Sequence, residues 1–146
     1  MDINTTVDIT AEIGRVWEAL ANPESWPAWM PDVTSVEALS SAGRAEYGAR
    51  YRVAQSWWRM NDQEILISEI REPEFFAFTA STTTGSYRFE YVLHERQPGT
   101  VHVEHRLSSD GLISSVAGAM GGSSMEKQLI AEAAALRDHC ESRNAG

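Results

Sequence analysis

The histidine at position 105 is the side chain in this sequence best suited to moving a proton. His105 lies between Val103 and Leu107 in a segment where apolar and polar residues alternate, so a strand would place these three side chains on one face. An imidazole exchanges a proton near neutral pH, which makes His105 a candidate general acid or base. It could equally hydrogen-bond a ligand or have a structural role, and the sequence leaves the three interpretations open.

Aromatic side chains recur at alternate positions in two other segments, 47–58 and 86–95. Such alternation places them on one face of a strand, and aromatic surface with a few polar groups is typical of a small-molecule site. We therefore expect ligand contacts from the following residues: Tyr51, Val53, Trp57, Tyr87, Phe89 and Tyr91.

Two tryptophan positions allow more than one interpretation. Trp29 could contact the ligand at a cavity rim, or it could pack against the end of the sheet. Trp57 and Trp58 must point to opposite faces of a regular strand, and a bulge near Arg59 would reverse the assignment. With Trp57 inside, Trp58 would be exposed or covered by the second copy in a homodimer.

The segment 114–124 consists mainly of glycine, serine and alanine, with Val116 and Met120 as its bulkier members. Small residues on a helix that faces aromatic strands would leave room for a ligand, which Val116 and Met120 would then contact. Alternatively, Gly121 and Gly122 break or kink the helix at this point.

Other potentially reactive residues do not form recognisable sites. His102 and Glu104 would share a strand face opposite to His105, so three metal ligands do not converge, and we expect no metal. Cys140 lies on an apolar helical stripe and is expected to be a buried structural thiol. Nothing in the sequence indicates a cofactor.

The order of elements that must position these residues can be predicted from periodicity. The segment 3–9 alternates as a half-buried strand, and Thr10 is expected to cap a helix over residues 11–20 whose buried face carries Ile13, Val16, Trp17 and Leu20. Pro23 is suited to begin a second helix over residues 23–30. Six further strands are expected at 33–39, 47–58, 63–70, 75–80, 86–95 and 100–108, followed by a helix from about residue 112 with Leu129, Ala133, Leu136 and Cys140 on one stripe.

The composition fits one soluble domain, residues 1–146, with 42% hydrophobic and 23% charged residues. The start of the chain lacks a secretory signal and no apolar run would span a membrane, so a cytoplasmic location without stable membrane insertion is expected. A formal charge of −9 disfavours nucleic acid as a partner.

This order of elements, with the motifs VDITAEIGRVWEAL, ESWPAWMPDV, Gly48-Ala49-Arg50-Tyr51 and ALRDHCE, resembles the polyketide cyclase/dehydrase and lipid-transport family of the START-like (SRPBCC) helix-grip superfamily. The resemblance implies an α+β fold in which a curved seven-stranded antiparallel sheet wraps around a long C-terminal helix. It also implies a cavity between sheet and helix, and supplies no shared catalytic motif.

Three functions remain open at this level. The first is binding, and possible transport, of a hydrophobic small molecule such as a lipid, polyketide or aromatic metabolite. The second is a polyketide cyclase/aromatase or dehydratase, which would need a converging acid/base pair. The third is a protein-interaction module, which would show an exposed apolar patch and a filled cavity.

Overall fold

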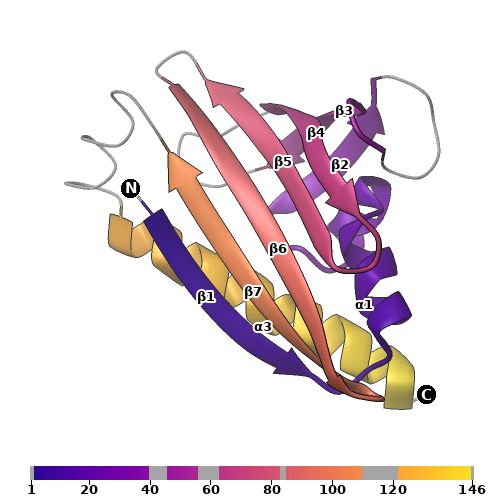
Figure 1. Cartoon of the computed structure of the whole chain (residues 1–146). Helices are drawn as coiled ribbons and strands as arrows, with labels where there is room; N and C mark the ends of the chain where they lie inside the picture. The colour runs from indigo at the N-terminus through magenta and orange to yellow at the C-terminus, as the bar shows by residue number, and fades with distance from the viewer. Residues whose placement is uncertain (1, 40–45, 56–62, 83–84, 110–121, 146) are drawn as a thin grey trace.

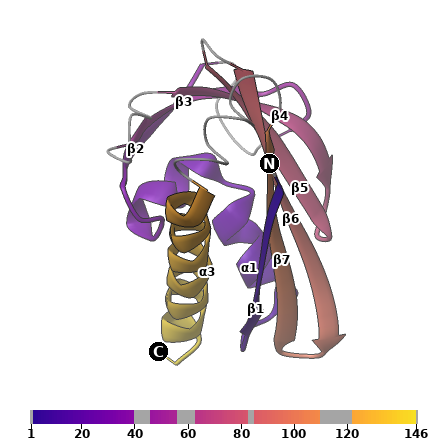
Figure 2. The same ribbon diagram turned by 90° about the vertical axis from the view of Figure 1, so that its left-hand side faces the viewer.

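The computed structural model describes residues 2–39, 46–55, 63–82, 85–109 and 122–145. Its architecture is an antiparallel sheet that curves around one long helix (Figures 1 and 2), which confirms the predicted helix-grip α+β fold. In Figure 2 the sheet arches over α3, with β2 and β3 on one side of the helix and β1 and β7 on the other. None of the described helices is both long enough and apolar enough to cross a membrane.

Seven strands form the sheet in the spatial order β1-β7-β6-β5-β4-β3-β2, and every neighbouring pair is antiparallel. From β2 to β7, strands that follow one another in the chain are neighbours in the sheet. The exception is β1, which pairs with the last strand, β7. The strands are β1 (Asp2–Ile9), β2 (Val33–Ala38), β3 (Arg50–Gln55), β4 (Gln63–Arg71), β5 (Phe75–Thr82), β6 (Gly85–Gln97) and β7 (Thr100–Ser109).

The predicted alternation of inward and outward side chains is confirmed on the following strands. On β1, Ile3 and Ile9 are buried while Asp2 and Asp8 are exposed, as the alternation requires. On β7, His105 is buried between Val103 and Leu107. His102 and Glu104 lie on the other face, where they pair with residues outside the core.

The helix α1 (Ile13–Leu20) buries Val16, Trp17, Ala19 and Leu20, which confirms the predicted inner face except at Ile13, which is only half-buried because it borders the outside of the fold. The expected cap at Thr10 is wrong, because Glu12 occupies the N-cap position. The backbone N–H of Thr10 instead donates to the carboxylate of Glu141, near the end of α3, at 2.9 Å. A contact between residues so distant in the chain cannot be seen in local sequence.

The second helical segment, η1 (Pro23–Ala28), is a 3-10 helix that begins at the proline, as predicted. Two indoles from this region bind the carbonyls that the end of α1 leaves without a helical partner. Trp26 donates from Nε1 to the carbonyl of Leu20 at 3.0 Å, and Trp29 donates to that of Ala19 at 3.3 Å. These hydrogen bonds join η1 to α1.

The C-terminal helix α3 (Gly122–Ala145) lies on the concave side of the sheet and packs against β1 and α1. Its buried side chains follow the predicted stripe, extended by Met125 at its start: Met125, Leu129, Ala133, Leu136 and Cys140. The expected helical stretch between residues 112 and 121 lies outside the described residues, as do Trp57, Trp58 and the strand residues 56–58.

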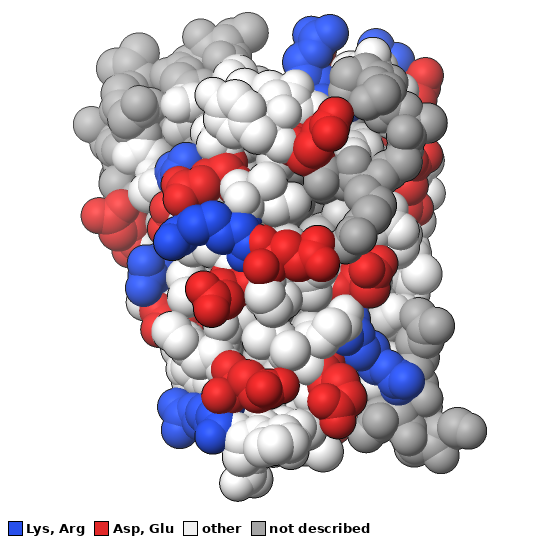
Figure 3. Space-filling view, turned by 45° about the vertical axis from the view of Figure 1, so that its right-hand side comes forward, with Lys and Arg blue, Asp and Glu red and all other residues white. Residues whose placement is uncertain are grey.

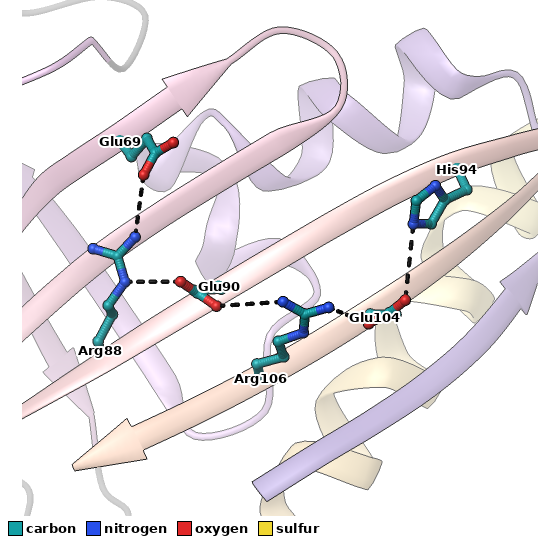
Figure 4. Close-up of polar contacts among 6 residues, drawn as sticks. All are labelled: Glu69, Arg88, Glu90, His94, Glu104 and Arg106. Atoms are coloured by element: carbon teal, nitrogen blue, oxygen red, sulfur yellow. Dashed lines mark hydrogen bonds and ion pairs between the residues drawn. The ribbon is translucent and has the colours of Figure 1, made fainter. Parts of the chain in front are cut away.

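The convex face of the sheet carries alternating ion pairs. Arg88 on β6 binds Glu69 and Glu90, while Arg106 on β7 binds Glu90 and Glu104 (Figure 4). In Figure 3 basic and acidic side chains alternate and do not separate into regions of one sign. We call this set, completed by His94 beside Glu104 at 3.8 Å, the outer ion-pair ladder. The ladder places Glu69 on the convex face, away from the core.

Candidate functional site

A small cavity lies between the concave face of the sheet and α3. Its volume is about 40 Å³, it is partly open to solvent, and roughly three water-sized groups would fit. The lining is mainly apolar and comes from five strands, from η1 with the turn after it, and from α3. The lining residues are Trp26, Met30, Val33, Val53, Gln63, Ile65, Phe78, Phe89, Tyr91 and Glu132.

Aromatic side chains form much of the wall of this cavity. Phe78 stacks on Phe89 with ring centroids 4.9 Å apart, and Trp26 packs on Phe78 at 5.2 Å. Tyr91 continues the wall, 6.4 Å from Phe78. The strands place these rings together because Phe78 and Phe89 are paired across β5 and β6.

Glu132 is the acidic group of the cavity. It lies on α3 between the buried positions Leu129 and Leu136, and its side chain is only 13% exposed. Burial raises the pKa of Glu132 to about 8, the Tyr91 hydroxyl opposes the rise, and the negative charge of Asp32 adds to it. The carboxyl group is therefore largely protonated at neutral pH.

His105 and Tyr91 lie next to this carboxyl group. The two rings stack with centroids 4.1 Å apart, and His105 Nε2 is 3.7 Å from Glu132 Oε2. Burial lowers the pKa of His105 to about 3, so its imidazole is neutral at physiological pH. Burial, followed by the nearby Glu132, raises the pKa of Tyr91 well above its ordinary value. Three elements, β6, β7 and α3, thus bring three proton-exchanging groups together.

The polar atoms of this cluster are not saturated by the described residues. Neither His105 ring nitrogen makes a hydrogen bond there, and the Tyr91 hydroxyl, close enough to Glu132 to act on the pKa of that carboxyl group, makes none of ordinary length and angle. The separation of 3.7 Å between His105 and Glu132 exceeds the hydrogen-bond limit. Because unsatisfied buried polar groups are costly, a cluster of them at a cavity is the pattern expected of a site completed by a ligand.

The structure divides the described residues that are predicted to touch a ligand between the cavity and the core around it. Val53, Phe89 and Tyr91 line the cavity, and His105 lies directly beside it. Tyr51 is buried in the core, and Tyr87 packs in a second cluster with Leu107 and Met125, among others.

The remaining predicted contacts are Trp29, Trp57, Val116 and Met120. Trp29 is absent from the cavity lining and stacks on His139 with ring centroids 6.4 Å apart. Trp57, Val116 and Met120 lie outside the described residues, so their roles stay predictions.

Sequence reasoning missed Glu132, although a signal was present. Glu132 follows Leu129 by three residues and precedes Leu136 by four, so it belongs to the same helical face as the apolar stripe. A carboxylate within such a stripe is either at its solvated edge or buried at a site. The structure places it at the cavity.

A larger hollow of about 570 Å³ lies on the outside, where α1 meets the turn between β4 and β5 and the end of β6. It is an open groove with a charged lining that includes Arg71, Glu74, His94 and Glu95. None of the buried proton-exchanging groups reaches it. Among the described residues no group of three or more His, Cys, Asp or Glu side chains is arranged to hold a metal ion.

Several solved structures share this fold. A START superfamily protein from Mycobacterium smegmatis is 14% identical, with 97% of each chain covered and a TM-score of 0.77. The di-domain aromatase/cyclase BexL of the BE-7585A biosynthetic pathway is 15% identical over 97% of this chain and 46% of its own, with a TM-score of 0.78. Norcoclaurine synthase from Thalictrum flavum is 9% identical over 99% and 96% of the two chains, with a TM-score of 0.75.

No curated protein matches the chain by sequence. At these identities the structural neighbours establish the fold alone. A family model described as polyketide cyclase / dehydrase and lipid transport matches residues 1–141. The chain therefore belongs to the polyketide cyclase/dehydrase and lipid-transport family.

Proposed function

We propose that this protein binds a hydrophobic small molecule in the cavity beneath the sheet. The observation that carries the proposal is the combination of an aromatic and aliphatic lining with a few polar side chains, namely Gln63 and the neighbouring pair Tyr91 and Glu132. Burial of apolar ligand surface against such a lining makes the free energy of binding favourable, and the few polar groups fix the ligand's orientation. The cavity's partial opening gives the rest of a longer ligand a way out to solvent.

The proposal can be tested by filling the cavity from a neighbouring pair of positions on β4. Ile65 lines the cavity and is 3% exposed, whereas Leu66 points to the outer face and is 41% exposed. Ile65→Phe should reduce the uptake of the neutral dye Nile red, measured by its fluorescence. Leu66→Phe adds bulk on the other face and should leave uptake unchanged.

Both variants must first be shown to be folded by circular dichroism and urea unfolding. If Ile65→Phe unfolds, Val53→Leu provides a smaller increase in volume from the adjacent strand β3, because Val53 also lines the cavity. Equal dye uptake by folded cavity variants and wild type would contradict the proposal.

A second function, that of a polyketide cyclase or dehydratase, is favoured by one observation. A converging acid/base set was the feature that would distinguish an enzyme from a binder, and Glu132, His105 and Tyr91 form such a set. Under this function, Glu132→Gln should abolish turnover of a polyketide-like substrate while leaving its binding largely intact. An unchanged rate would exclude Glu132 from the reaction.

The interaction-module alternative finds less support in the described part of the chain. The large apolar side chains exposed there are Tyr47, Leu66 and Ile130. Leu66 lies on the convex face of the sheet and Ile130 on α3, so the three do not form one continuous patch.

A further inference from the structure

We infer that the ligand of this cavity carries a protonated amine, and that the side chain of Glu132 is the group that binds it. This inference rests on the proposed function and specifies its ligand class. It is drawn from the acceptors around Glu132, the aromatic wall and the sign of the surrounding charge.

Glu132 lacks a cationic partner among the described residues that line the cavity, none of which is lysine or arginine. The basic side chain that contacts Glu132 in the described structure is His105, and the lowered pKa of His105 keeps its imidazole uncharged. A buried carboxylate without a positive partner is held in its neutral form by the cost of desolvation. An ammonium group would supply the missing charge.

The geometry around Glu132 matches a group with several N–H donors. Tyr91 lines the cavity next to Glu132, and its buried hydroxyl makes no hydrogen bond of ordinary geometry with the described residues. His105 Nε2 and Glu132 Oε2 are 3.7 Å apart, too far to bond each other. One donor nitrogen about 2.9 Å from each atom could serve both. A primary ammonium has three donors for these three acceptors.

The wall of the cavity adds a second feature suited to a cation. Trp26, Phe78, Phe89 and Tyr91 all line it. Aromatic rings attract ammonium groups through the negative potential of their faces, and the attraction grows when water is excluded. The space of about 40 Å³ accepts a water-sized head group without displacement of the wall.

The sign of the surrounding charge distinguishes an amine from an anionic ligand. Three donors around one point could also bind an enolate oxygen, with Glu132 protonated. The chain carries a net charge of −9, however, and the charge of Asp32 acts on Glu132 itself. Arg88 and Arg106 lie on the convex face in the outer ion-pair ladder (Figure 4). This field stabilises a cation in the cavity and opposes an oxyanion.

Binding must release a proton, because the amine and Glu132 both arrive protonated. An alkylammonium and the Glu132 carboxylic acid give an ammonium–carboxylate pair and one proton in solution. Among the residues that the structure describes, the titratable groups that act on Glu132 are Tyr91 from β6, His105 from β7 and Asp32 from the turn before β2. Of these, Tyr91 and His105 stay neutral between about pH 5 and pH 8, given the directions of their pKa shifts. The released proton is then that of Glu132.

The test compares hexylamine with hexanol, which has the same alkyl chain and a neutral head group. Binding is measured by isothermal titration calorimetry in buffers of different ionisation enthalpy. Hexylamine affinity should rise with pH by about tenfold per unit below a pH of about 8, because only the ionised fraction of Glu132 is competent. One proton should be released per amine bound, and hexanol should show neither effect.

Glu132→Gln separates the inference from the proposed function. The variant keeps the size and hydrogen-bonding capacity of the side chain but cannot ionise, so it should lose the preference for hexylamine and the proton release while still binding hexanol. If hexanol binds and hexylamine binds no more tightly at any pH, or more weakly as the pH rises, the amine inference is wrong and the cavity still binds ligands. If neither compound binds the wild type, the proposed function fails as well.

Discussion

His105 Nε2 on β7 and Glu132 Oε2 on α3 lie 3.7 Å apart, across the contact between the sheet and the helix it surrounds. Burial shifts their pKa values in opposite directions, that of His105 down to about 3 and that of Glu132 up to about 8. Both groups are consequently uncharged near neutral pH, and their pairing leaves hydrogen-bonding capacity for a third partner.

The two shifts predict a characteristic dependence of stability on pH. Between a pH of about 4.5 and about 8, folded Glu132 holds a proton that the unfolded chain has released, so its contribution to stability falls as the pH rises. His105 acts in the opposite sense between about 3 and 6.5, because the unfolded chain binds the proton there. The two contributions oppose each other from about 4.5 to 6.5, and only the fall due to Glu132 remains between 6.5 and 8.

Glu132→Gln isolates this effect. The free energy of unfolding of wild type minus that of Glu132→Gln should fall steadily as the pH is raised from about 4.5 to about 8, in urea titrations at several pH values. A difference that is constant over this range would show that Glu132 has an ordinary pKa, and would also remove the basis for proton release on amine binding.

Trp17 is predicted to contribute strongly to the packing of α1 on the sheet. Its side chain is 2% exposed and meets Phe76 edge to face, with centroids 6.2 Å apart. Trp17→Ala should lower the free energy of unfolding by about 3–5 kcal/mol, as other large-to-small core substitutions do. Trp17→Phe keeps much of the volume and should cost less. A urea midpoint unchanged by Trp17→Ala would contradict the observed orientation of α1.

Two glycines provide a matched pair for backbone effects. Gly99 has φ +87, between β6 and β7, whereas Gly14 lies within α1 at ordinary helical angles, and an added Cβ meets nothing within 4 Å at either position. Gly99→Ala should therefore destabilise the protein by about 1 kcal/mol, and Gly14→Ala should stabilise it by about 0.5–1 kcal/mol. Thermal unfolding of both variants tests this, and a shift in the same direction for both would be inconsistent with these backbone conformations.

The outer ion-pair ladder is predicted to matter little for stability. Arg88 and its partner Glu69 are 33% and 44% exposed, so water and salt screen their attraction. Arg88→Met should cost about 1 kcal/mol or less, with a smaller effect at high salt. Arg50→Met, which removes a more exposed pair with Glu64, serves as the control. A loss of about 3 kcal/mol or more would show that the ladder acts as a cooperative network.

Much of the fold could be predicted because it depends on local periodicity. The alternation around His105 and the helical spacing of Val16, Trp17 and Leu20 were sufficient to assign their buried faces, since one face of each element must be covered. The expected cap at Thr10 failed because its N–H group has a partner on α3. Contacts between distant elements leave no mark in local spacing.

The site was less predictable for the same reason. The alternation along the strands placed Val53, Phe89 and Tyr91 on the inward face. Which inward residues border the cavity, however, depends on how Phe78 and Trp26 pack. Glu132 could have been identified from its place on the apolar stripe of α3. Its distance to His105 depends on how α3 packs against the concave face of the sheet. That tertiary packing cannot be read from local sequence.

The central claim, that the cavity beneath the sheet is the ligand site, is tested most directly by nuclear magnetic resonance of the methyl groups. Titration with hexanol should produce saturable shifts at Val53, Ile65 and Met30, which line the cavity. Leu66 on the outer face and Ile13 in the outside groove should stay unchanged. Saturable shifts at Ile13 without any at Val53 or Ile65, or no saturable shift at all, would contradict the account.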